Sequence, residues 1–225
     1  MESKIYAIGD IHGCIRPFRV LLEDEIRPGK DDKIILLGDY VDRGSDSKAV
    51  VDYIIELQKN EYDIIPLKGN HEVMLLESTR SEISLLNWLY NGGGETLKSY
   101  DIYSIAELDK VYIDFYNNLP YYYSLGDYYF VHAGFNDDIE NPFEDKYHMI
   151  WKYREKYDHP VFKNKTIVHG HFPVRKIKIT ENEKNNSTDI NVDSGCVYTE
   201  TEGYGMLSAI ELNSMQIFSV NNLFI

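Results

Sequence analysis

The stretch DKIILLGDYVDRG, residues 32–44, joins an apolar run directly to a loop that carries two carboxylates and an arginine. A short apolar run bounded by glycine is typical of a buried strand. Asp39, Asp42 and Arg43 therefore follow the end of a strand predicted near residues 33–37. Taken alone, this loop also fits a solvated surface turn with a weak ion pair, so the rest of the chain must decide its function.

Four other apolar runs end in polar loops in the same way, and they predict strands at about residues 4–8, 63–67, 128–131 and 166–168. Between the first three strands, apolar residues at helical spacing predict helices over 14–26 and 46–58, with Asp46 as the N-cap of the second helix. Strands that alternate with helices imply βαβ units with parallel pairing.

After Pro120 the sequence patterns change to those of β-strands. Strand-like runs flank Gly126-Asp127 and Asn213-Ser214, which predicts hairpin turns at both places, and the polar stretch TENEKNNSTD at 180–189 predicts a hairpin tip. The chain shows no internal repeat and no linker long enough to separate domains. The predicted fold class is therefore α/β, with parallel and antiparallel strands in a single domain over residues 1–225.

Residues 73–125 are predicted to form a mainly helical segment near the functional site, where they would act as a wall or lid. Ser104 and Glu107 have the spacing of a capping box, and apolar residues then recur at three- and four-residue steps up to Leu119. This pattern predicts a helix that begins at residue 105. The three glycines at 92–94 should divide the segment in two.

Composition excludes several classes of function. Lysine and arginine number 23 against 37 aspartates and glutamates, giving a net charge of −14 without a basic run. A groove that binds nucleic acid normally needs a basic stripe, so we expect no nucleic-acid partner. No apolar stretch reaches the roughly 18 residues of a membrane span, so we expect no membrane partner either. The sequence leaves the oligomeric state open.

The first residues, MESKIYAIGD, lack the pattern of a secretory signal, and the chain has only two cysteines, Cys14 and Cys196, far apart in sequence. This cysteine usage favours a reducing compartment, and we expect a cytoplasmic protein. An acidic chain that binds phosphate needs a local source of positive charge, and metal ions supply it.

The strand-end loops carry side chains of the types that bind metal ions. Each such residue alone is more often structural, but five separate strand ends with these residues predict a metal centre. The set combines oxygen and imidazole donors without thiolates, which suits Mn above all, with Fe, Zn, Ni or Mg as alternatives. Six donors exceed the needs of one catalytic ion and so predict two divalent ions. The predicted ligands are Asp10, His12, Asp39, Asn70, His132 and His171.

Three motifs, GDIHG at 9–13, GDYVDRG at 38–44 and GNHE at 69–72, resemble those of the metal-dependent phosphoprotein phosphatase (PPP) family within the calcineurin-like metallophosphoesterase superfamily. VHAG at 131–134 and HGHFPV at 169–174 extend the resemblance, although Ala133 stands where many members have glycine. The compact length is similar to the bacterial and phage branch of the lambda protein phosphatase type. The resemblance implies a central β-sandwich of mixed sheets flanked by helices.

The resemblance also implies how the metal ligands are divided. Asp10 and His12 would hold one ion, and Asp39 would bridge to the second. Asn70, His132 and His171 would complete the second site, with His169 as supporting structure.

The remaining roles implied by the resemblance concern the reaction. A water molecule activated by the two metals would attack phosphorus in line. His71 would protonate the leaving oxygen, and Asp42 would orient this histidine and favour its charged form. Arg43, Asn70 and Arg154 would bind the phosphate oxygens. Tyr198 is the candidate for the aromatic side chain that eukaryotic members place over the site.

Two activities fit these motifs. The first interpretation is a serine/threonine protein phosphatase that hydrolyses phosphomonoesters of a phosphoprotein, and phosphotyrosine is compatible with the same site. The alternative is a symmetric bis(5′-nucleosyl)-tetraphosphatase, which acts on a small phosphorylated substrate. Both would use one metal centre, so the motifs do not separate them. A phosphate-binding scaffold without turnover is disfavoured because His71, Asp42 and Arg43 are all present.

Overall fold

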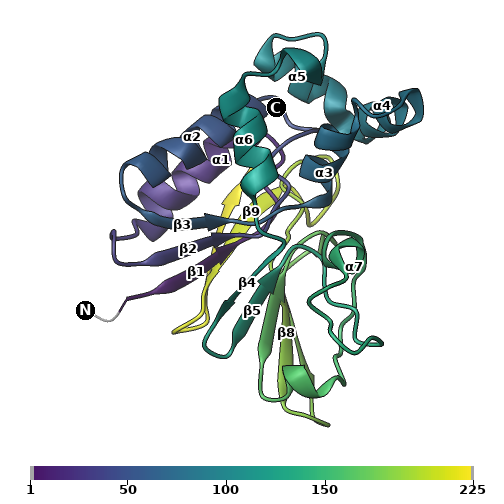
Figure 1. The fold of residues 1–225 in the computed structure, drawn as a ribbon. Coiled ribbons are helices and arrows are strands. Elements are labelled where there is room, and N and C mark those ends of the chain that lie inside the picture. The colour runs from purple at the N-terminus through teal and green to yellow at the C-terminus, as the bar shows by residue number, and fades with distance from the viewer. Residues whose placement is uncertain (1–2, 224–225) are drawn as a thin grey trace.

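The computed structural model describes residues 3–223 and stacks two five-stranded sheets against each other (Figure 1). The first sheet has the order β10 (Gln216–Asn221), β9 (Met206–Glu211), β1 (Ile5–Ile8), β2 (Lys33–Leu36), β3 (Asp63–Pro66). The second sheet has the order β4 (Tyr122–Leu125), β5 (Tyr128–Val131), β6 (Thr166–His169), β8 (Ser187–Asn191), β7 (Lys178–Asn182). The predicted sandwich of mixed sheets is confirmed.

Parallel pairing places the ends of several strands at one edge. In the first sheet, Leu36 pairs with Ile8 on one side and with Pro66 on the other, so β1, β2 and β3 end level with one another. Pro66 is tolerated because β3 is an edge strand. In the second sheet β5, β6 and β8 are also parallel. The loops that follow these strands therefore emerge together.

The last three residues of β1 and of β2 are buried, so both faces of these strands are covered, which explains why they are continuous apolar runs. Alternate side chains such as Ala7, Ile35, Phe130 and Val168 pack between the two sheets. The intervening residues of β1 and β2 face a second core under the helices. Val131 and Ile167 belong to a third cluster on the outer face of the second sheet, together with aromatic side chains.

Helices cover the outer face of each sheet (Figure 1). The first sheet lies under α1 (Ile15–Val20), its continuation as a π-helical turn η1 (Leu21–Ile26), α2 (Ser47–Lys59) and α6 (Lys110–Asn118). The second sheet packs against α7 (Lys146–Trp151) and the 3₁₀ turn η4 (Pro160–Phe162). The Asp46 carboxylate accepts from the Ala49 amide at 3.1 Å, so Asp46 caps α2 as predicted.

The segment between β3 and β4 is mainly helical, and consists of α3 (Asn70–Glu77), α4 (Glu82–Trp88), η2 (Leu89–Gly93), α5 (Gly94–Tyr100), the 3₁₀ turn η3 (Ile105–Glu107) and α6. Gly92, at φ 103°, interrupts the helix as the triple glycine predicts. The prediction of one helix that begins at residue 105 is wrong. Ser104 caps only the single turn η3, because Leu108 is extended at ψ 131°, and α6 begins afresh at Lys110.

Both predicted hairpin turns are confirmed, and the predicted hairpin tip at 180–189 is shorter than expected. β4 pairs with β5 around Gly126-Asp127, and β9 pairs with β10 around Asn213-Ser214. Most of the polar stretch at 180–189 is strand, since β7 and β8 pair as far as Asn182 and Ser187. Only residues 183–186 form the tip.

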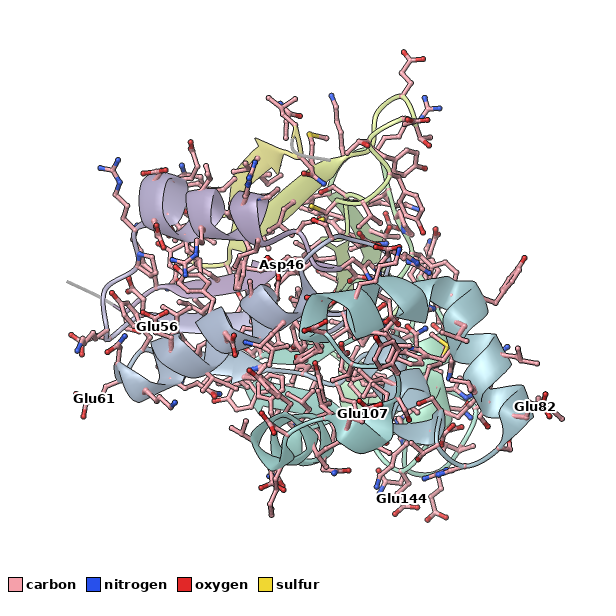
Figure 2. The ribbon with its side chains drawn as sticks, turned by 90° about the horizontal axis from the view of Figure 1, so that it is seen from above. Asp46, Glu56, Glu61, Glu82, Glu107 and Glu144 are labelled. Atoms are coloured by element: carbon pink, nitrogen blue, oxygen red, sulfur yellow. The ribbon has the colours of Figure 1, made fainter. Side chains whose placement is uncertain are left out.

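The acidic excess is spread over the surface. In Figure 2, Glu61, Glu82 and Glu144 lie near different edges of the view, whereas Asp46 lies nearer its centre at the start of α2. Within residues 3–223, no helix combines the length and the apolar character that crossing a membrane requires.

Candidate active site

The loops after five strands bring the predicted ligands together. Two groups of side chains have donor atoms within 4.8 Å of one another: His12, Asp39 and His71 form one, and Asp39, His132 and His171 form the other. Asp39 thus belongs to both groups. This placement supports its predicted role as a bridge, which stays a prediction.

Distances place Asp39 at the centre. Its Oδ2 atom lies 3.5 Å from His12 Nε2, 3.4 Å from His132 Nε2 and 3.9 Å from His71 Nε2. The Oδ1 atom of Asp39 accepts from the His71 amide at 3.0 Å, which ties the carboxylate to the first turn of α3. Three imidazole rings therefore converge on one buried carboxylate.

The second group includes the predicted amide ligand. His132 Nε2 lies 2.9 Å from Asn70 Oδ1 and 3.0 Å from His171 Nδ1. Asp10 belongs to neither of the two groups above, but both of its oxygens accept from the His171 amide, at 3.1 and 3.2 Å. All six predicted ligands thus lie within one connected site.

The histidine rings are oriented as metal ligands require. His12 Nδ1 lies 2.8 Å from the Val41 carbonyl, and His132 Nδ1 lies 2.8 Å from the Leu37 carbonyl. A carbonyl accepts only from N–H, so each Nε2 of the neutral ring carries a lone pair that points into the site. With a neutral ring, the lone pairs of His132 and Asn70 would face each other at 2.9 Å, so this contact needs a positive charge, either a proton on His132 or a metal ion. The oxygen and imidazole donors fit divalent ions.

Buried charge also demands a cation. Burial raises the pKa of Asp10 well above its usual range, and the nearby Asp193 carboxylate raises it further. Burial also acts to lower the pKa of His132, but the Asp39 and Asp10 carboxylates outweigh it and raise that pKa to about 10. In the metal-free protein a proton on His132 therefore offsets part of the negative charge that metal ions would neutralise.

Arg43 already supplies positive charge to the site. Its Nη1 atom lies 2.9 Å from His12 Nε2, the atom predicted to bind a metal. The guanidinium also lies over the ring of Tyr198, 5.8 Å from its centroid. This contact places Tyr198, the aromatic candidate from the sequence, beside the predicted phosphate-binding arginine.

His71 and Asp42 form a buried pair. His71 Nδ1 lies 2.7 Å from Asp42 Oδ2, and both side chains are almost completely buried. Burial lowers the pKa of His71 to about 4 and raises the pKa of Asp42 to about 7, while hydrogen bonds from Thr96 and Trp88 favour the ionised carboxylate. The metal-free imidazole is therefore neutral near pH 7 and donates its Nδ1 hydrogen to Asp42. The predicted charged form needs a further source of negative charge.

Glu72 has a role that the sequence analysis did not assign. Its carboxylate is fully buried and accepts from three backbone amides: Asp39 at 3.0 Å, Tyr40 at 2.8 Å and Gly69 at 2.9 Å. It therefore joins the loop after β2 to the loop after β3. Glu72 lies three residues after Gly69, the N-cap of α3, which is the spacing of a capping box. This spacing is the feature of the sequence from which the role of Glu72 could have been predicted.

Backbone strain is concentrated in the site. His12, Asp39, Asp42, Arg43 and His171 all have left-handed φ angles, between 45° and 70°. Each such residue costs about 1–2 kcal/mol relative to ordinary backbone. Strain of this size persists only where surrounding contacts fix it, so the loops are built to present these side chains.

Two glycines allow the strained loops to approach each other. A Cβ atom on Gly69 would lie 2.1 Å from Asp39 Oδ1, and one on Gly38 would lie 2.8 Å from His132 Nδ1. Gly38 also has φ 107°, which favours glycine. Any larger residue at either position would displace a predicted metal ligand.

Arg154 and His169 have clear contacts of their own. The Arg154 guanidinium pairs with Asp138 at 2.7 Å and with Asp137 at 3.4 Å, so its predicted contact with phosphate stays a prediction. His169 is fully buried and pairs with Asp189 at 3.1 Å. This pair fits the structural role predicted for His169.

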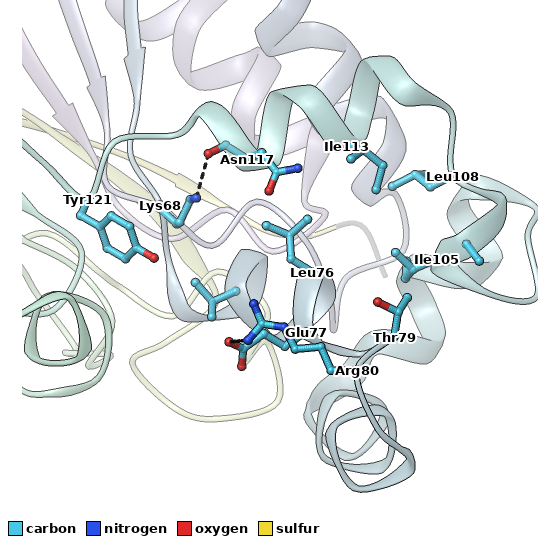
Figure 3. A pocket seen from close by; sticks show the side chains of 12 residues that line it. Lys68, Leu76, Glu77, Thr79, Arg80, Ile105, Leu108, Ile113, Asn117 and Tyr121 are labelled. Carbon is cyan, nitrogen blue, oxygen red and sulfur yellow. Dashed lines mark hydrogen bonds and ion pairs between the residues drawn. The ribbon is translucent and has the colours of Figure 1, made fainter.

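A pocket of about 580 Å³ lies beside α3 and α6, lined by Leu76, Ile113 and Tyr121 among others (Figure 3). Lys68 lines it and donates to the Asn117 carbonyl at 3.1 Å, in the last turn of α6. A cation at a helix C-terminus is a stabilising structural contact. None of the predicted metal ligands lines this pocket, so it is not the reaction centre.

Residues 3–199 match the family model described as calcineurin-like phosphoesterase. The chain belongs to this family. The match covers all six predicted metal ligands together with His71, Asp42 and Arg43, and it confirms the superfamily that the motifs indicate. The lambda protein phosphatase type is not shown.

Individual members of the calcineurin-like phosphoesterase family are similar over shorter stretches. The symmetrical bis(5′-nucleosyl)-tetraphosphatase of Buchnera aphidicola (subspecies Schizaphis graminum) is 33% identical over 104 residues, which cover 38% of this chain and 37% of that protein. Serine/threonine-protein phosphatase 1 of Salmonella typhimurium is 34% identical over 89 residues, covering 40% and 38% respectively. Each match thus spans less than half of the relative.

The fold of this family member agrees with a solved structure over nearly its whole length. A crystal structure of a protein provisionally assigned as a diadenosine tetraphosphatase superposes with a TM-score of 0.64 at 20% identity. The superposition covers 97% of this chain and 93% of the other. At this identity the likeness shows the shared fold.

Glu72→Gln should lower the free energy of unfolding by about 2–4 kcal/mol, because an amide group would face a backbone N–H that now donates to a carboxylate. Burial raises the pKa of Glu72 to about 7, so urea unfolding should be measured near pH 8, with chelator, where the carboxylate is ionised. Glu77→Gln, on the exposed side of the same helix, is the control. Equal stability of the two variants would contradict the role of Glu72.

Asp39→Asn should abolish stoichiometric binding of two divalent ions, because the shared carboxylate loses its charge and half of its strong donor capacity. Metal content after manganese loading and desalting gives the measure. Asp127→Asn, at an exposed carboxylate that pairs with Lys165, should bind like the parent protein. Full occupancy in Asp39→Asn would rule out the bridging role.

Proposed function

We propose that this chain is a metal-dependent phosphoester hydrolase that cleaves symmetric dinucleoside tetraphosphates. The observation that carries the hydrolase proposal is one carboxylate, Asp39, shared by two ligand groups and adjacent to the His71–Asp42 pair. The substrate proposal rests on similarity to the symmetrical tetraphosphatases of several bacteria. This similarity favours the alternative above over the protein phosphatase that the motifs put first.

Protein phosphatase activity remains the second candidate function. The specific support is the 34% identity to serine/threonine-protein phosphatase 1 over 89 residues. Both reactions need attack on phosphorus, stabilisation of negative oxygens and departure of an oxygen leaving group. The predicted residues serve all three needs in either case.

The ligand set would hold two divalent ions, which activate water and neutralise phosphate oxygens when bound. We expect manganese first, and the oxygen and imidazole donors also accept Fe, Zn, Ni or Mg. Asn70, in the first turn of α3, would serve both as a metal ligand and as a donor toward a phosphate oxygen. Arg43 offers paired N–H donors to the same phosphate.

Hydrolysis exchanges one phosphorus–oxygen bond for another. The oxygen of water forms a bond to phosphorus as the phosphorus–oxygen bond to the leaving group breaks. In a symmetric tetraphosphate this yields two nucleoside diphosphates, and in a phosphomonoester it yields an alcohol and inorganic phosphate. The leaving oxygen takes a proton from His71 Nε2, and the attacking water releases one.

His71 must therefore gain a proton when substrate binds. Burial lowers its pKa to about 4 in the free protein, which keeps the ring neutral. A polyphosphate brings several negative charges close to the ring, and neighbouring negative charge raises a histidine pKa. Asp42 then stabilises the imidazolium through the 2.7 Å contact to Nδ1. The negative charge of the substrate would thus raise the pKa of His71, which the free site alone does not do.

The manganese-loaded protein should show a higher kcat/KM on diadenosine tetraphosphate than on a phosphothreonine peptide, by at least about tenfold. Chromatographic detection of ADP and colorimetric detection of phosphate measure the two rates. ADP as the sole nucleotide product would confirm symmetric cleavage, whereas AMP with ATP would contradict it. A clear excess on the peptide would favour the protein phosphatase instead.

His71→Asn should bind metal normally but lose about 10²- to 10⁴-fold in kcat on phosphomonoesters with poor leaving groups, as expected when a general acid is removed. Substrates such as p-nitrophenyl phosphate, which release a stable anion, should lose far less. His148→Asn, at a histidine that pairs with Asp145 on α7, is the control. Unchanged turnover of poor leaving groups in His71→Asn would remove its assigned role.

A further inference from the structure

The carboxylate of Asp42 accepts hydrogen bonds from two side chains of the helical segment that follows α3. Trp88 Nε1, at the end of α4, lies 3.0 Å from Oδ1 and 2.9 Å from Oδ2. The Thr96 hydroxyl, on α5, donates to Oδ1 at 2.6 Å. His71 Nδ1 takes the remaining position on Oδ2. Both carboxylate oxygens are therefore engaged, and all four residues are buried.

Thr96 fixes the backbone of Asp42 as well as its side chain. Its Oγ1 atom accepts from the Asp42 amide at 2.9 Å while it donates to the carboxylate. Asp42 and Arg43 are consecutive left-handed residues, at φ 70° and 68°. The Gly92 carbonyl accepts from the Arg43 amide at 3.3 Å. The helical segment thus holds the strained turn through direct contacts with both residues.

The glycines between α4 and α5 have no room for side chains. A Cβ atom on Gly92 would lie 2.8 Å from the Arg43 amide nitrogen and 2.9 Å from its Cγ atom. A Cβ atom on Gly93 would lie 2.4 Å from the indole ring of Trp88. The glycine turn is therefore shaped to bring Trp88 and the Asp42–Arg43 turn against each other.

Ordinary core packing does not account for this arrangement. A buried indole needs an acceptor for its N–H group, and any backbone carbonyl would serve. Elsewhere in the same segment, the buried hydroxyl groups of Tyr100 and Tyr116 form a hydrogen bond of 2.7 Å with each other and do not contact the site. Trp88 and Thr96 instead donate to Asp42, the carboxylate that lies 2.7 Å from the ring Nδ1 of the proposed acid, His71.

We propose that Trp88 and Thr96 are positioning residues that hold Asp42, and through it the His71 ring, in the orientation from which Nε2 reaches the leaving oxygen. The proposal rests on the function proposed above, in which His71 is the general acid. Neither side chain touches the substrate. Their effect on His71 passes through the carboxylate of Asp42. The Asp42 amide also donates to Ser47 Oγ at 3.1 Å, which keeps an acceptor for that amide in Thr96→Val, so the main loss should fall in the step that uses His71.

The first test compares Trp88→Phe and Thr96→Val with Tyr100→Phe on manganese-loaded protein, using aryl phosphates that span a wide range of leaving-group pKa. Thr96→Val conserves volume, and Tyr100→Phe removes a buried hydroxyl from the same segment without touching Asp42. The first two variants should lose about ten- to a hundredfold in kcat on the poorest leaving groups, with KM within twofold. Tyr100→Phe should behave like the parent protein on every substrate.

The leaving-group series separates positioning from a general loss of structure. A partly unfolded or metal-poor variant loses the same fraction of kcat on every substrate, and such a parallel loss in Thr96→Val would overturn the proposal. Thr96→Val should also cost less than twofold further when added to His71→Asn. If the loss in the double variant equalled the product of the two single losses, Thr96 would act independently of His71, and this result would also overturn the proposal.

The second test does not depend on turnover. In metal-free protein, the His71 Nδ1 hydrogen bonded to Asp42 should give a downfield proton resonance, assigned by its loss in His71→Asn. This resonance should move or broaden in Trp88→Phe and Thr96→Val and stay in place in Tyr100→Phe. An unchanged resonance in both variants would overturn the positioning role. An inactive parent protein with the resonance shifts as expected would contradict only the proposed function.

Discussion

The site depends on one buried carboxylate that is not among the predicted metal ligands. Glu72 accepts hydrogen bonds from the amides of Asp39, Tyr40 and Gly69, and so it fixes the loop after β2 against the loop after β3. Hydrogen bonds to an ionised acceptor are about twice as strong as neutral ones. Asp39 and the start of α3 therefore have a set distance from each other before any ion binds, and the shared carboxylate is placed by the backbone.

Strain in the loops follows from this constraint. Five site residues have left-handed backbones, and contacts from outside their own loops hold three of them: Glu72 for Asp39, and Thr96 with Gly92 for the turn at Asp42 and Arg43. Such conformations persist only when the surroundings over-determine them. The two sheets supply the common edge, and the helical segment between β3 and β4 supplies the support behind it.

Sequence alone predicts the part of this design that is local. Apolar runs ending in polar loops predict β1, β2, β3, β5 and β6, and the motifs after them supply the side chains that the fold brings together, the predicted ligands as well as Asp42 and Arg43. Trp88 and Thr96 lie 46 and 54 positions from Asp42, and no local pattern connects them to it. Ser104 does cap a helical turn, since its hydroxyl accepts from the Ala106 amide at 3.2 Å, yet Leu108 is extended, because packing decides how far a capped helix continues. Contacts across such distances, and helix length, need the fold.

Arg43 shows how the free site and the loaded site must differ. Its Nη1 atom lies 2.9 Å from His12 Nε2, and the Nδ1 of that ring is 2.8 Å from the Val41 carbonyl. The neutral ring therefore has one lone pair, and the guanidinium uses it. A metal ion on His12 and a donor from Arg43 exclude each other, because both need the same electrons. If His12 held an ion, the guanidinium would be free to turn its donors toward the oxygens of a phosphate, while the contact of the Arg43 amide with the Gly92 carbonyl would keep its backbone in place.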